Sequence, residues 1–113
     1  MQVTYIASSN VSTNGVALGA AGQDVRVYGL LIGLPVASGD IQIYNITNPV
    51  GDASTNLAAK ITLPGSLPTT GADVAVYRSF GPEGLPLNDG GNVQIDATMQ
   101  VSVIWDVADD SVS

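Results

Sequence analysis

The sequence contains no cysteine and no histidine, and only one lysine and one glutamate. Without cysteine, disulfides, thiolate metal sites and cysteine nucleophiles are excluded. Without histidine, the chain lacks the commonest general base and the commonest transition-metal ligand, and a Ser-His-Asp arrangement cannot be built. These absences predict that the protein is not an enzyme and that it uses no metal and no cofactor.

Positive charge is also scarce. The chain has three cationic side chains, Arg26, Lys60 and Arg78, against ten acidic residues, and its net charge is −7. Such a chain cannot neutralise a row of phosphates, and an anionic membrane surface would repel it. The longest apolar stretch, 27–36, is interrupted by glycine and proline and is shorter than the ~18 residues of a membrane span. We therefore predict no nucleic-acid partner and no membrane partner. The start of the chain also lacks the basic and apolar runs of a secretory leader.

Carboxylates are the remaining groups that could perform chemistry. Asp73, Asp96 and Asp106 are the candidates for an acid–base pair, but all three fall at the outward positions of predicted strands, where a carboxylate is usually solvated. The turn Asp89–Asn92 lacks the repeated acidic ligands of a calcium loop. We interpret these residues as surface and turn residues.

What the chain does contain is β-branched and aliphatic. Hydrophobic residues make up 45% of it, and 13 glycines and 6 prolines separate short segments rich in Val, Ile, Leu and Thr. The strongest signal is the run 93–107, in which nearly every second residue is apolar. A period of two is that of a strand with one buried face, so this run predicts one long strand or two strands bent near Ala97.

Shorter alternating segments occupy 1–7, 25–32, 41–44, 61–63 and 74–77. Together these segments predict an all-β, single-domain antiparallel β-sandwich of jelly-roll or immunoglobulin-like topology with seven to eight short strands. Residues 1–22 carry no charged side chain and are predicted to be an extended N-terminal arm or the first strand. The β-sandwich domain would cover 23–107, and an acidic C-terminal tail would cover 108–113.

Two groups of residues are candidate contacts with a partner. The first group lies in the possible arm, which would dock on a neighbouring subunit; it comprises Val3, Tyr5, Ile6 and Val11. The second group occupies the strand positions opposite the aliphatic rows, and it would share one exposed sheet face if its strands are neighbours. It comprises Arg26, Tyr28, Gln42, Tyr44, Asp73 and Tyr77. The alternative is that these tyrosines are half-buried at the rim of the sandwich.

Four stretches of the sequence carry a family resemblance: the uncharged segment 11–22, VRVYGLLI at 25–32, GDIQIY at 39–44 and VQIDATMQVSVIW at 93–105. In these stretches the chain resembles the small capsid decoration (cement) proteins of tailed bacteriophages. The resemblance implies a β-sandwich without an active site, assembled in the host cytoplasm as a homotrimer and seated on the outer capsid surface of the virion. Its partner would be the major capsid protein, whose subunits it would bridge and stabilise.

Two other classes remain open from the residues. A carbohydrate- or receptor-binding module of a phage tail or fibre would hold a glycan against Tyr28, Tyr44 and Tyr77. A cellular scaffold or adhesin subunit would use the same faces within an oligomer. The arm hypothesis further predicts that deleting 1–12 leaves a folded domain that no longer attaches to particles.

Overall fold

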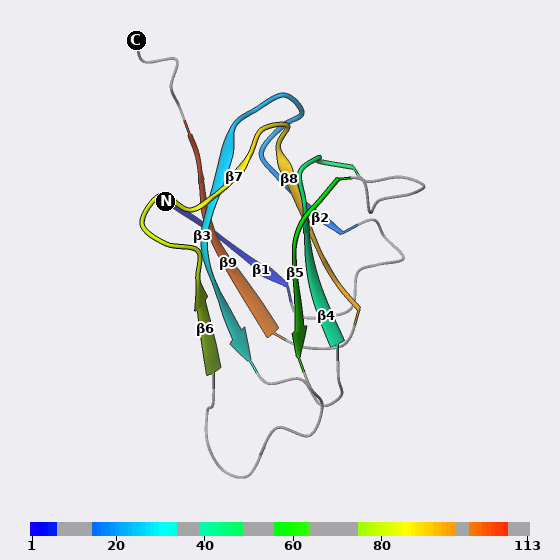
Figure 1. The fold of residues 1–113 in the computed structure, drawn as a ribbon, viewed down its shortest axis with the longest axis vertical. Helices are drawn as coiled ribbons and strands as arrows, with labels where there is room; N and C mark the ends of the chain where they lie inside the picture. The colour runs from blue at the N-terminus through cyan, green and yellow to red at the C-terminus, as the bar shows by residue number, and fades with distance from the viewer. Residues whose placement is uncertain (7–14, 34–38, 49–55, 64–74, 97–99, 109–113) are drawn as a thin grey trace.

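The computed structural model describes residues 1–6, 15–33, 39–48, 56–63, 75–96 and 100–108 (Figure 1). In this part of the chain, nine strands form two antiparallel sheets, which confirms the predicted all-β sandwich. The strands are β1 (Gln2–Ile6), β2 (Val16–Leu18), β3 (Val25–Gly33), β4 (Gly39–Tyr44), β5 (Leu57–Leu63), β6 (Ala75–Ser79), β7 (Leu85–Leu87), β8 (Gly91–Ile95) and β9 (Gln100–Val107).

The first described strand pairs with the last, and successive strands pair in the same way towards the middle of the sequence. Sheet A has the order β1-β9-β3-β6, with β7 also paired to β3, and sheet B has the order β2-β8-β4-β5. The pairs β1–β9, β2–β8, β3–β6 and β4–β5 are nested within one another, as in one long hairpin that is folded over into two layers. This nesting is jelly-roll topology, so the structure decides between the two topologies that the sequence leaves open.

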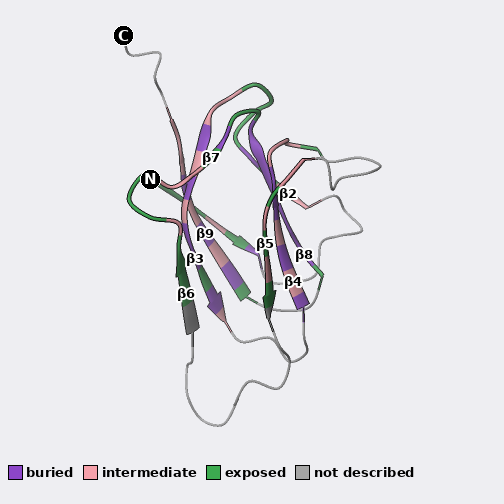
Figure 2. Ribbon diagram, viewed as in Figure 1, coloured by how far each residue is buried: buried purple, intermediate pink, exposed green. Residues whose placement is uncertain are grey.

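The core lies between the sheets and follows the period-two pattern. On β3 and β9 the inward side chains are buried and alternate with partly exposed ones, as Figure 2 shows in purple and pink. The fully buried side chains are aliphatic and come from both layers. They include Leu18, Val25, Val27, Leu30, Ile41, Ile43, Leu87, Val93, Ile95, Val101 and Val103.

The alternating run 93–107 forms two strands rather than one. Its first part is β8 in sheet B and its second part is β9 in sheet A, so the chain changes layer between Ile95 and Gln100. The second of the two predicted arrangements is therefore the observed one.

Two short strands lie outside the alternating segments that the sequence predicts as strands. β2 and β7 each have three residues, which is too short for a period to be visible in the sequence. Each is defined by its partner, since β2 pairs with β8 and β7 pairs with the first half of β3. They bring the number of strands above the seven or eight predicted.

The start of the chain is the first strand of sheet A. Gln2–Ile6 pairs with β9 over its whole length, and Ile6 is buried in the core. Deleting this segment would remove a sheet strand and a core side chain, and not a separable arm. The rest of the predicted arm through 14, including Val11, lies outside the described residues, as do Asp73 and most of the predicted acidic tail.

Candidate functional site: the outer face of sheet A

Exposed apolar side chains gather on one face of the sandwich. Among the described residues, the large hydrophobic side chains that are exposed belong to the outer face of sheet A or to the N-terminus beside it. Their exposed fractions are 75% for Met1, 65% for Val3, 59% for Tyr5, 44% for Leu31 and 55% for Tyr77. The edge strands β1 and β6 accordingly show green in Figure 2, whereas β8 is purple throughout.

The strand register aligns these side chains across the sheet. Tyr5 is opposite Ser102 on β9, Ser102 is opposite Leu31 on β3, and Leu31 is opposite Tyr77 on β6. A second row runs from Val3 through Ile104 to Gly29 and Ser79. We call the set Val3, Tyr5, Leu31, Tyr77 and Ile104 the apolar face.

The ring of Tyr77 lies over the backbone of β3 at Gly29. A Cβ atom built on Gly29 would come within 2.5 Å of the Tyr77 hydroxyl oxygen and 2.8 Å of its ring carbons. The absence of a side chain at Gly29 therefore makes room for the ring to lie flat across the two rows. The tyrosine is 55% exposed and still held by the sheet beneath it, which makes it a pre-positioned aromatic contact.

Two cationic groups and one carboxylate lie close together on this side of sheet A. Arg26 and Asp106 are cross-strand partners with outward positions, and the N-terminal ammonium of Met1 lies 3.0 Å from Asp106 Oδ2. Hydrogen bonds from that ammonium and from the Val107 backbone N–H hold the pKa of the Asp106 carboxyl below its usual value. Arg26 Nη1 also donates to the Glu83 backbone oxygen at 3.0 Å. On a chain of net charge −7, this face is close to neutral.

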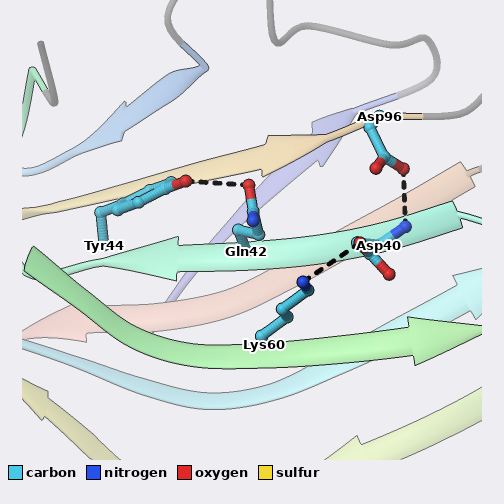
Figure 3. A network of polar contacts seen from close by, with 5 residues as sticks. All are labelled: Asp40, Gln42, Tyr44, Lys60 and Asp96. Carbon is cyan, nitrogen blue, oxygen red and sulfur yellow. Dashed lines mark hydrogen bonds and ion pairs between the residues drawn. The ribbon is translucent and has the colours of Figure 1, made fainter. Parts of the chain in front are cut away.

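The outer face of sheet B is polar instead (Figure 3). Lys60 Nζ lies 3.5 Å from Asp40 Oδ2, and the Asp40 backbone N–H donates to Asp96 Oδ1 at 2.6 Å. The Tyr44 hydroxyl donates to Gln42 Oε1 at 2.8 Å, and burial raises the pKa of that phenol. These polar side chains find their partners within sheet B, whereas the outer face of sheet A exposes apolar side chains.

The second predicted group of contact residues does not share one face. Arg26, Tyr28 and Tyr77 belong to sheet A, whereas Gln42 and Tyr44 belong to sheet B on the other side of the core. Tyr44 is only 5% exposed, because it lies at the end of β4 where its ring is covered, and Arg26 and Tyr28 are half-buried.

The first predicted group is divided by the pleat of β1. Val3 and Tyr5 point outwards and belong to the apolar face, while Ile6 points inwards and is buried in the core. Ile6 is therefore unsuited to the contact role predicted for it. Leu31 and Ile104 also belong to the apolar face and are not among the predicted contact residues, although the sequence carries a signal for both. In each case the residues two positions before and after on the same side of the strand are polar or glycine, which marks the side as outward, while the residue itself is apolar.

The two described carboxylates of the predicted acid–base set are not brought together. Asp96 directly follows the end of β8 in sheet B, and Asp106 is on β9 in sheet A. Within the described ranges, no group of three or more acidic residues is placed to hold a metal ion. In the same ranges, no helix has the length and apolarity needed to cross a bilayer.

Comparison of the chain with protein-family models, with curated proteins and with solved structures gives no match in any of the three.

Proposed function

We propose that this protein is a virion structural protein that decorates the outer surface of an icosahedral phage capsid, binding capsid subunits through the apolar face of sheet A. The observation that carries the proposal is the concentration of exposed apolar side chains on that one face. Contiguous apolar patches on a soluble domain mark interaction sites, because leaving them in water gains nothing and costs solubility.

The character of the face supports a protein partner. It has two exposed tyrosines held on strands, and the Asp106 carboxylate on the same sheet is paired, which suits a contact that buries the face against another protein surface. Jelly-roll sandwiches occur among viral capsid and lectin domains, and this likeness of topology raises the expectation without assigning the role.

The size of the face supports a repeated, individually weak contact. The exposed side chains present on the order of 500 Å² of largely apolar surface, since a tyrosine alone can contribute 150–250 Å². A stable interface buries about 800 Å² on each partner. A contact of this size is weak by itself, but many copies on a capsid lattice would act together through avidity. The acidic remainder of the chain would face solvent and other particles.

Two measurements test the proposal. Mass spectrometry of purified particles whose packaged DNA encodes this chain should find it at a fixed copy number relative to the major capsid protein. Its absence from those particles would overturn the capsid role.

The role of the apolar face is tested with the double variant Leu31→Gln/Tyr77→Gln. The variant should cosediment with capsids that lack the protein at least about tenfold more weakly than the unaltered chain, because two large apolar contacts are lost. The matched control is Thr62→Gln, an exposed residue of β5 on the opposite sheet, which should attach normally. Equal attachment of both variants would show that another surface binds.

The glycan-binding alternative requires Tyr28, Tyr44 and Tyr77 on one face. Tyr44 lies in the other sheet and is buried, so the three do not form one site. A glycan site limited to Tyr28 and Tyr77 would still be detected by glycan-array binding that Tyr77→Ala abolishes. Capsid attachment retained by the same variant would point back to decoration, whereas a chain that binds glycan and does not attach to capsids would favour the glycan function.

A further inference from the structure

The four sheet edges of the sandwich are protected unequally. An exposed edge strand presents unpaired backbone groups, and proteins blunt such edges with charged residues, proline or very short strands. In sheet A, β6 carries Arg78 and β7 carries Pro86; in sheet B, β5 carries Lys60 and β2 has only three residues. β1 is five residues long and contains no charge, proline or glycine. Among the described residues it pairs with β9 alone.

We infer that β1 pairs with β1 of a second copy of this chain, antiparallel and centred on Thr4, so that the two A sheets become continuous. The strand is complementary to itself in this register. Val3 of each copy is opposite Tyr5 of the other on the outer face, and Thr4 is opposite Thr4. Aromatic with β-branched residues and threonine with threonine are among the cross-strand pairs that stabilise antiparallel sheets.

Charge favours a second copy at this edge rather than at any other. Two chains of net charge −7 repel each other, so a contact between copies requires a surface that carries little of that charge. β1 has no charged side chain, and the nearest acid on the neighbouring strand β9, Asp106, is paired with the Met1 ammonium. No like charges would therefore oppose one another across the new strand pair.

The second copy also completes the apolar face. This step rests on the proposed function, because it concerns the same surface. With β1 next to β1, the Val3 and Tyr5 side chains of both copies lie at the centre of one continuous face. Its area is doubled to on the order of 1,000 Å², which exceeds the ~800 Å² that one side of a stable interface buries. The resemblance described above implies a trimer, whereas an isologous strand pair gives a two-fold dimer.

The pairing is tested by a charge swap at two positions that are each more than half exposed, so that folding is retained. Val3→Lys/Tyr5→Lys places lysine opposite lysine in both cross-strand pairs, and Val3→Glu/Tyr5→Glu places glutamate opposite glutamate. Sedimentation velocity over a concentration series should show the unaltered chain in a monomer–dimer equilibrium, and each variant weakened by roughly tenfold or more. An equal mixture of the two variants should recover a heterodimer, identified by native mass spectrometry.

A matched control is Leu31→Lys/Tyr77→Lys, which changes the same face away from β1 and should remain dimeric. An unaltered chain that is monomeric at every concentration, or trimeric, would overturn the inference. So would dimeric charge variants, or a mixture that forms no heterodimer. Far-UV circular dichroism and the fluorescence of Trp105, the only tryptophan, verify that each variant is folded.

The two proposals fail in different ways. If the chain dimerises through β1 but does not attach to capsids, the proposed function fails and the strand pairing stands. If it attaches while remaining monomeric, the strand pairing alone fails. A second measurement that needs no variant is amide hydrogen exchange, in which the β1 amides should become more protected as the protein concentration rises.

Discussion

Two adjacent leucines on β3 experience opposite environments. Leu30 points inwards and is fully buried, whereas Leu31 points outwards and is 44% exposed. Leu30→Ala should lower the free energy of unfolding by about 2–5 kcal/mol, because it removes buried methyl groups and leaves a cavity. Leu31→Ala should change it by roughly 1 kcal/mol or less, although it removes the same atoms. Urea unfolding of both variants checks this, and equal losses would contradict the assignment of the two faces.

Also at the residue scale, the free energy of unfolding should depend on pH through the Asp106 carboxyl. Its pKa is lower in the folded protein than in the unfolded chain, owing first to the Met1 ammonium and then to the Val107 N–H. The carboxylate therefore stabilises the fold above the unfolded pKa of about 3.9, and this contribution is lost as the pH falls through the folded pKa.

Asp106→Asn should accordingly be less stable than the unaltered protein near neutral pH, and the two should converge in acid. Thermal unfolding measured from neutral to acidic pH checks the convergence. A constant difference at every pH would show that the ion pair does not titrate as described.

At the scale of elements, a partly buried side-chain hydrogen bond joins β1 to β9. Trp105 Nε1 donates to Thr4 Oγ1 at 2.9 Å, and Trp105 is only 7% exposed. Thr4→Val keeps the shape of the side chain and removes the acceptor, so the indole N–H would be left without its partner. The expected cost is about 1–3 kcal/mol in the free energy of unfolding.

The control for this prediction is Thr62→Val, which makes the same chemical change at an exposed residue of β5. It should leave stability within about 0.5 kcal/mol. If both variants unfold at the same urea concentration, the Trp105–Thr4 bond contributes nothing measurable.

The elements themselves were predictable where a period was long enough to read. The segments that form β1, β3, β4 and β9 alternate over four residues or more, and each is a strand. β2 and β7 have three residues each, so their existence depends on β8 and β3 and not on any local pattern. The bulge at Tyr28, where the register between β3 and β9 shifts, is likewise set by pairing.

At the scale of the whole molecule, the sequence predicts the two-layered class but not the arrangement of its faces. Whether Tyr44 and Tyr77 share a surface depends on which strands are neighbours, and in a jelly roll those neighbours are far apart in the chain. The candidate site was therefore only partly predictable. Val3, Tyr5 and Tyr77 belong to it, but the row that links them through Leu31 becomes visible only once β9 and β3 are placed between β1 and β6.

The position of β9 has a consequence for biosynthesis. Among the described strands it is the last in chain order, yet it lies between β1 and β3 and holds sheet A together. During translation, β1 leaves the ribosome long before its partner β9. Its uncharged apolar side chains stay uncovered until β9 emerges. The nascent chain should therefore depend on chaperones or rapid elongation during that time, and should become protease-resistant only after β9 has emerged.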